Sequence, residues 1–194
     1  IMFPLSDMRG RVLGFGARAM GEGRGPKYLN TSDGELYHKG RQLFGADLAR
    51  APAAKAGSVI VVEGYTDVLA LHQAGLRNCV GIMGTALTED QVAALARMAP
   101  TVVLALDADS AGQDAMLRAA RVAAGRKLEL RVVEMPEGTD PAELVAREGG
   151  DAVRSRLEGS VPFVRFRVDQ ALAHGDVSNA EGKDRVLAEV GPVL

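Results

Sequence analysis

The stretch SVIVVEGYTDVLALHQAG, residues 58–75, decides the fold of this chain. It opens with an unbroken run of β-branched residues at 59–62, which is typical of a strand buried on both faces. Apolar residues then recur at helical spacing over 66–74, and Gly75 ends the pattern. A buried strand followed directly by a helix indicates one unit of an α/β fold with a parallel sheet.

The same unit repeats downstream. We expect three further strands at 79–83, 102–106 and 128–133, separated by helices at 88–98 and 111–124. Thr88 is a suitable N-cap for the first of these helices, and Pro100 lies just beyond its end. Residues 57–137 are therefore predicted to form one domain, a four-stranded parallel sheet flanked by helices.

Different patterns flank this central part. Residues 1–56 contain short β-like runs interrupted by glycine-rich turns, with Asp33-Gly34 as a hairpin-type turn signal, and predict a small, mainly antiparallel β subdomain. Within it, residues 49–57 have the composition of a linker, and residues 21–26 have that of a loop. Residues 138–194 show only helical patterns, broken at glycines, and predict a C-terminal helical subdomain.

Charge is segregated along the chain, although the net charge is only −2. Residues 9–41 contain seven basic and three acidic residues, whereas residues 134–148 contain five acidic residues and one basic residue. A local excess of positive charge favours contact with phosphates. Aromatic residues make up only 4% of the chain and tryptophan is absent, which excludes a broad aromatic platform for stacking bases.

The cysteine and histidine content limits the classes of protein further. A single cysteine, Cys79, excludes an internal disulfide and favours a reducing cytoplasm. Three dispersed histidines and one cysteine do not make an ordinary structural zinc site. No apolar run approaches the roughly 18 residues that a membrane span needs, so we expect no membrane partner.

Carboxylates gather where the predicted strands end. Glu63 ends the first strand, and Asp107 ends the third with Asp109 two residues later. Ligands bind beyond the carboxyl ends of the strands in an open parallel sheet, where crowded carboxylates need a cation. Oxygen ligands select Mg²⁺ or Mn²⁺. Asp67, one helical turn after Glu63, and Asp140, after the fourth strand, extend the cluster. Any one of them alone is more simply explained as a helix cap, but their convergence favours a metal site.

These residues carry a family resemblance. Glu63-Gly64-Tyr65-Thr66-Asp67, followed by Asp107-Ala108-Asp109, resembles the Toprim motif of bacterial primases, topoisomerases, recombination mediators and some nucleases. The segments 10–18, 26–30 and 38–45 resemble the basic subdomain that precedes Toprim in bacterial DnaG-type primases. The resemblance covers nearly the whole chain in the right order. It implies a Toprim-type sheet at 57–137, with residues 1–56 as the C-terminal part of the primase N-terminal subdomain.

The resemblance implies a Mg²⁺-dependent nucleotidyltransferase, a DNA-directed RNA polymerase that makes short RNA primers on a single-stranded DNA template from ribonucleoside triphosphates. Two or more Mg²⁺ or Mn²⁺ ions are expected, with Asp107 and Asp109 as the principal ligands, joined by Asp67 and Asp140. Glu63 is either a ligand or a proton acceptor. The residues expected to bind nucleotide or template are Arg18, Lys27, Asn30 and Lys39. The family often has a further aspartate where this chain has Ala142. Either the ion site farther from Asp107 has fewer protein ligands and more water, or Glu143 compensates.

The same resemblance implies a fragment of a longer protein that acts at the replication fork. Zinc is expected only in a preceding module, and the replicative helicase is expected to bind a following domain, both absent here. The isolated piece is then predicted to be inactive or nearly so. Two alternatives remain: a Toprim nuclease or topoisomerase, and a non-catalytic Toprim scaffold for DNA repair. The tyrosines all fit primase-like motifs, which disfavours a topoisomerase, and the full set of five acids disfavours a scaffold.

Overall fold

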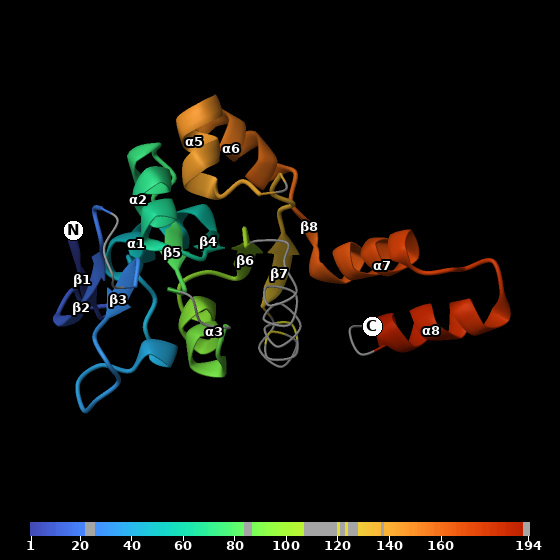
Figure 1. Ribbon diagram of the computed structural model, residues 1–194, viewed down its shortest axis with the longest axis horizontal. Helices are drawn as coiled ribbons and strands as arrows, with labels where there is room; N and C mark the ends of the chain where they lie inside the picture. The colour runs from blue at the N-terminus through green and yellow to red at the C-terminus, as the bar shows by residue number, and fades with distance from the viewer. Residues whose placement is uncertain are drawn as a thin grey trace.

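The computed structural model describes residues 1–21, 26–83, 87–106, 120, 123, 128–136 and 138–191. A central sheet lies between helices, a small sheet packs at one side, and the last two helices extend away from the other side (Figure 1). None of the helices in the described ranges is both long enough and apolar enough to cross a membrane.

The central sheet has the strand order β5-β4-β6-β7-β8. Its strands are β4 (Ser58–Val62), β5 (Cys79–Gly81), β6 (Thr101–Leu104), β7 (Glu129–Val132) and β8 (Val161–Pro162). The first four are parallel, which confirms the four-stranded parallel sheet expected from the sequence.

The fifth strand corrects the prediction that residues 138–194 are helical only. In β8, Val161 pairs with Val132 and Pro162 pairs with Arg131, both antiparallel to β7. A proline lacks the backbone donor, and it is tolerated here because β8 is the last strand of the sheet in the described chain. The C-terminal region therefore contributes directly to the central sheet.

Both faces of the sheet are buried, as the β-branched run predicts. Val59 and Val61 of β4 lie in a core cluster with residues of α1 (Ala46–Ala56) and α3 (Glu89–Ala96). Ile60 and Val62 point to the other face. They lie in a second cluster with residues of the helices α2 (Tyr65–Gln73), α5 (Pro141–Glu148) and α6 (Gly150–Glu158). The predicted helices at 66–74 and 88–98 are thus confirmed. The one at 111–124 lies outside the described residues except for Ala120 and Ala123, which are helical.

Helix α1 is where the prediction of a linker at 49–57 was wrong. Ala46, Ala49 and Ala53 are all buried, and their spacing of three and four residues places them on one face of the helix. This face packs closely on the central sheet, so there is room only for small side chains at these three positions. The helix tolerates Pro52 in its interior, and it begins after Gly45 and ends before Gly57, both with positive φ.

The small N-terminal sheet is antiparallel, as expected, with the order β1 (Met2–Ser6), β2 (Val12–Arg18) and β3 (Tyr28–Asn30). Phe3 and Leu5 are buried in the second core cluster, which joins this sheet to the central one. The expectation of a hairpin turn at Asp33-Gly34 was wrong. The chain runs from β3 into the 3-10 turn η1 (Lys39–Arg41), and Asp33 accepts a hydrogen bond from the Lys39 backbone N–H at 2.9 Å.

The C-terminal helices continue after β8 as α7 (Phe163–His174) and α8 (Ala180–Val190). Phe163 lies in the first core cluster, which anchors the start of α7 to the sheet. Beyond that point α7 and α8 pack mainly on each other through a small apolar cluster that includes Ala171 and Val186, and they extend away from the central sheet (Figure 1).

Candidate active site

A cleft of about 490 Å³ lies where the N-terminal sheet meets the carboxyl ends of the central strands. It collects residues that are far apart in sequence, from β3, η1, the start of α2 and the start of α5. Six of the predicted site residues line it: Lys27, Asn30, Lys39, Glu63, Asp67 and Asp140. The cleft therefore brings acidic and basic residues together, a combination suited to a metal ion together with phosphates.

Asp67 has a structural role besides facing the cleft. Its side chain is 5% exposed. One carboxylate oxygen, Oδ2, accepts the Gly64 N–H at 3.0 Å, and Oδ1 accepts the Ala142 N–H at 3.3 Å. Asp67 thus connects the N-terminus of its own helix, α2, to the N-terminus of α5.

Asp140 caps a helix and also lines the cleft. It is the N-cap of α5, and its Oδ1 accepts the Glu143 N–H at 2.7 Å. It also lines the cleft and is exposed to solvent. Glu63 follows the last residue of β4 directly, and its backbone carbonyl accepts the Met83 N–H at 2.8 Å. This bond fixes the point at which Glu63 leaves the sheet, and its half-buried side chain lines the same cleft.

Two of the predicted basic site residues are grouped around Tyr28. The Lys27 ammonium lies 5.9 Å from the centre of the Tyr28 ring, and the Arg18 guanidinium lies 5.6 Å from it. Both distances fit cation–π contacts. Tyr28 and Lys27 line the cleft. Arg18 is not among its described lining residues, but it contacts Tyr28, which is.

Comparisons with known proteins point to one family. Residues 60–145 match the Toprim-like family model, and residues 1–50 match the N-terminal domain of the DNA primase catalytic core. The DNA primases of Escherichia coli K12 and Streptomyces coelicolor are each 39% identical over all of this chain, which covers 34% and 31% of their lengths. The chain belongs to the bacterial DNA primase family.

Solved structures place the chain within the primase catalytic core. A DNA primase domain from Pseudomonas aeruginosa matches with a TM-score of 0.87 and 37% identity, over 100% of this chain and 61% of that one. A DnaG primase catalytic domain bound to single-stranded DNA matches with a TM-score of 0.84 and 38% identity, over 96% of this chain and 61% of that one. The chain spans about a third of the length of the curated relatives that it matches.

The structure describes only some of the acids that are predicted to bind metal in this primase core. Asp107 and Asp109, the predicted principal ligands, lie outside the described residues. Among the residues that are described, no three His, Cys, Asp or Glu side chains form a group able to hold an ion. The donor atoms of Glu63, Asp67 and Asp140 are all oxygens, the type that a hard divalent cation prefers. Their chemistry therefore fits such an ion, although these three described acids do not form a complete site by themselves.

The departure from the primase pattern at Ala142 has a structural counterpart. The backbone N–H of Ala142 donates to Asp67, so this position supports a predicted ligand even without a carboxylate of its own. The Glu143 carboxylate lies 3.8 Å from the Arg147 guanidinium on the exposed surface of α5. Glu143 is not among the described residues that line the cleft.

Sequence reasoning assigned no role to Tyr65, which lines the cleft in this primase core. Its hydroxyl donates to Asn30 Oδ1, and its ring packs on Phe3 and Phe44 with centroids 5.1 and 4.9 Å away. Burial raises the pKa of Tyr65, while the bond to Asn30 opposes the shift. Tyr65 therefore stays a neutral donor that orients the Asn30 amide. The only signal in the sequence was its place between Gly64 and the first turn of the predicted helix.

Proposed function

We propose that this chain is the nucleotidyl-transfer core of a primase, which joins ribonucleotides on a single-stranded DNA template to make short RNA primers. One observation carries the proposal. A single cleft combines the carboxylates of Glu63, Asp67 and Asp140 with the cations of Lys27 and Lys39. A metal-bound triphosphate needs both signs of charge at once, and a bare metal site or a bare nucleic-acid surface does not.

The carboxylates would hold Mg²⁺ or Mn²⁺, two or more ions, with Asp107 and Asp109 completing the set. Such ions lower the pKa of an attacking hydroxyl and neutralise the charge of the leaving pyrophosphate. Lys27 and Lys39 act as point charges toward phosphates, since an ammonium has no fixed fork geometry. Arg18 acts from farther away, through the Tyr28 ring. Glu63 either binds an ion or accepts the proton of the attacking hydroxyl. The effect of Glu63→Gln on metal binding distinguishes these two roles.

The amide of Asn30 gives the cleft a neutral hydrogen-bonding group beside these charges. Tyr65 fixes its orientation through the bond to Asn30 Oδ1, and the Asn30 NH₂ group is then left to donate to a phosphate or sugar oxygen. A zinc-binding module and a domain that binds the replicative helicase, both expected from the resemblance, would be other parts of a longer protein in the bacterial cytoplasm.

Metal binding is tested on the 194-residue chain by Mn²⁺ titration, followed by electron paramagnetic resonance. Asp140→Asn and Asp109→Asn are expected to weaken binding about tenfold or more, the loss that even a supporting residue of a metal site causes. Glu63→Gln weakens it similarly if Glu63 is a ligand, and leaves it intact if Glu63 is the proton acceptor. Glu89→Gln, which removes an exposed acid from α3, is the matched control.

Catalysis is tested in the polypeptide that carries this chain, by incorporation of labelled ribonucleotides on single-stranded DNA. Asp107→Asn, Asp109→Asn and Lys39→Met are expected to abolish or strongly reduce primer synthesis, with native circular dichroism retained. Lys55→Met, which removes an exposed lysine of α1, is expected to leave it unchanged. Full activity in Asp109→Asn, or metal-dependent DNA cleavage in place of synthesis, would contradict the proposal.

A further inference from the structure

The 3-10 turn η1 is held in place by residues that do not line the cleft. Lys39, its first residue, lines the cleft and is half-buried. The rest of the turn faces the N-terminus of α3, about fifty residues later in the sequence. The backbone of η1 is bonded on both sides. On one side, the Lys39 N–H donates to Asp33 at 2.9 Å. On the other side, two side chains at the N-terminus of α3 donate hydrogen bonds to backbone carbonyls at η1.

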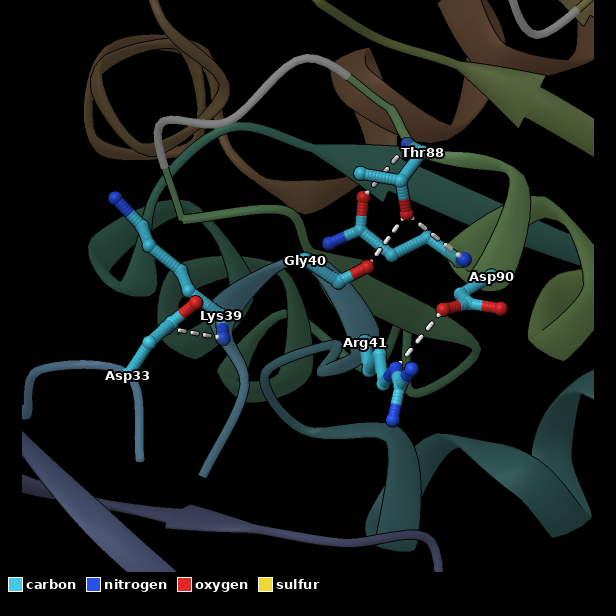
Figure 2. Close-up of polar contacts among 7 residues, drawn as sticks. Asp33, Lys39, Gly40, Arg41, Thr88 and Asp90 are labelled. Atoms are coloured by element: carbon cyan, nitrogen blue, oxygen red, sulfur yellow. Dashed lines mark hydrogen bonds and ion pairs between the residues drawn. The ribbon is translucent and has the colours of Figure 1, made fainter. Parts of the chain in front are cut away.

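Thr88 and Gln91 make those two bonds. The Thr88 hydroxyl donates to the Gly40 carbonyl at 2.5 Å, and the Gln91 amide Nε2 donates to the Gln42 carbonyl at 2.9 Å. Figure 2 shows the Thr88 hydroxyl joined to the Gly40 carbonyl, with the side chains of Lys39 and Arg41 leaving the turn in different directions. The two carbonyls that flank Arg41 are therefore both bonded to a single helix N-terminus.

The same two side chains also form the capping box of α3, and they use different atoms for the cap and for η1. Thr88 Oγ1 accepts the Gln91 N–H at 3.1 Å, and Gln91 Oε1 accepts the Thr88 N–H at 3.0 Å. Those bonds use only acceptor atoms. The donor groups, the Thr88 O–H and the Gln91 NH₂, are not needed by the cap, and both are used on η1. A glutamate at position 91 would complete the box equally well but would have no donor for Gln42.

The remaining contact between η1 and α3 is weaker. Arg41 Nε lies 3.0 Å from Asp90 Oδ2, but the two side chains are 64% and 62% exposed. Exposed ion pairs contribute little, because solvent screens them and both side chains lose conformational freedom. Gln91, in contrast, is fully buried at 0% exposure. The conformation of η1 thus depends on Thr88 and Gln91 more than on the ion pair.

We propose that Thr88 and Gln91 are positioning residues for substrate binding. They fix the backbone of η1 so that the Lys39 ammonium stays in the cleft, where it can bind a phosphate. The inference rests on the proposed function, because it takes Lys39 to bind a phosphate of the nucleotide or the template. Neither residue touches the substrate, and each acts only through the backbone of η1.

The test uses the 194-residue chain and two probes, Mg²⁺ with ATP and a fluorescein-labelled single-stranded DNA oligonucleotide. Thr88→Val removes the hydroxyl at nearly constant volume. Lys39→Met first identifies which of the two probes depends on Lys39. For that probe, Thr88→Val is expected to weaken binding about fivefold, which corresponds to the loss of one hydrogen bond. Thr88→Ser keeps the hydroxyl and is expected to bind within about twofold of the parent chain.

Loss of the α3 cap is controlled separately. Asn179→Ala removes the N-cap of α8, whose side chain accepts the Gly182 N–H at 2.7 Å, far from the cleft. It is expected to lower stability as much as Thr88→Val does, without changing affinity. Thr88→Gly removes the hydroxyl that donates to Gly40, but glycine is a tolerated N-cap, so α3 should keep most of its stability. This variant is expected to weaken binding as much as Thr88→Val does.

A double-mutant cycle decides whether Thr88 acts through Lys39. In the Lys39→Met background, Thr88→Val is expected to cause no further loss of affinity. An equal further loss would overturn the inference, as would wild-type affinity in Thr88→Val while Lys39→Met is impaired. If Lys39→Met leaves both probes unaffected, the phosphate-binding role of Lys39 fails and the inference fails with it.

Discussion

Asp67 offers the sharpest test of how this cleft is built, because the structure gives it a role that does not depend on metal. Its two oxygens hold the N-termini of α2 and α5 together, through Gly64 at 3.0 Å and Ala142 at 3.3 Å. A residue that served only as a metal ligand would behave differently in the metal-free protein. Removing one of several crowded carboxylates would then relieve repulsion and raise stability.

The expected magnitude follows from the two bonds. Hydrogen bonds to a charged group contribute about 1.5–3 kcal/mol each, so we take about 2 kcal/mol for the shorter bond. The bond to Ala142, at 3.3 Å, is longer than usual, so we take only about 1 kcal/mol for it. Asp67→Ala should therefore lower the free energy of unfolding by about 3 kcal/mol. For a chain of this size, 1 kcal/mol shifts the melting temperature by about 2–4 °C, which gives a decrease of about 9 °C.

The assay is thermal unfolding followed by circular dichroism in buffer with EDTA. Asp140→Ala is the matched comparison, since it removes one helix-capping bond and should cost about 1 kcal/mol, or about 3 °C. A melting temperature for Asp67→Ala equal to or above that of the parent chain in EDTA would refute the reasoning, and would leave Asp67 as a ligand only.

Three further predictions concern residues outside the cleft. The buried Tyr37 hydroxyl has no hydrogen-bond partner in the described chain, so Tyr37→Phe should leave the free energy of unfolding at neutral pH unchanged, or raise it by up to about 1 kcal/mol, in urea titrations. Burial raises the pKa of Tyr37 from 10.0 to about 12, so the folded chain holds this proton more tightly than the unfolded chain does. The parent should therefore lose stability as the pH rises through this window, and Tyr37→Phe should lose less; equal losses would contradict the assignment. Cys79 is buried with its thiol pKa raised by burial, so it should react with a disulfide reagent such as DTNB only after unfolding, and rapid reaction in native buffer would be inconsistent with the fold. The exposed Arg41–Asp90 pair predicts that Asp90→Asn changes the free energy of unfolding by less than about 0.5 kcal/mol, and a loss above about 1 kcal/mol would show that this pair was underestimated.

The central sheet could be predicted because burial on both faces leaves a direct mark on the sequence. Val59, Ile60, Val61 and Val62 point alternately to two core clusters, so every position of the strand is apolar. Helix α1 left no comparable mark. Its buried face consists of alanines, whose apolar signal is too weak to reveal a helical period, and Pro52 in its interior suggested a break.

Tertiary contacts account for what the sequence did not reveal about the rest. Strand β8 has two residues, one of them a proline, and exists only because β7 is beside it. In the site, strand ends and helix starts identified Glu63, Asp67 and Asp140 as neighbours of one edge. The bond from Ala142 to Asp67 and the bond from Thr88 to Gly40 join segments 75 and 48 residues apart, and no local pattern encodes such pairs.

Strand β8 also determines how this polypeptide can be shortened. It covers the outer edge of β7, where Arg131 Nε donates to Ser160 Oγ at 3.0 Å, next to the paired strands. An uncovered strand edge is a template for pairing with another molecule, and so a starting point for aggregation. A piece ending soon after Asp140 would retain the acids of the cleft but would expose that edge and lack Phe163 in the core. The smallest piece that keeps this cleft without self-association should therefore extend past Phe163.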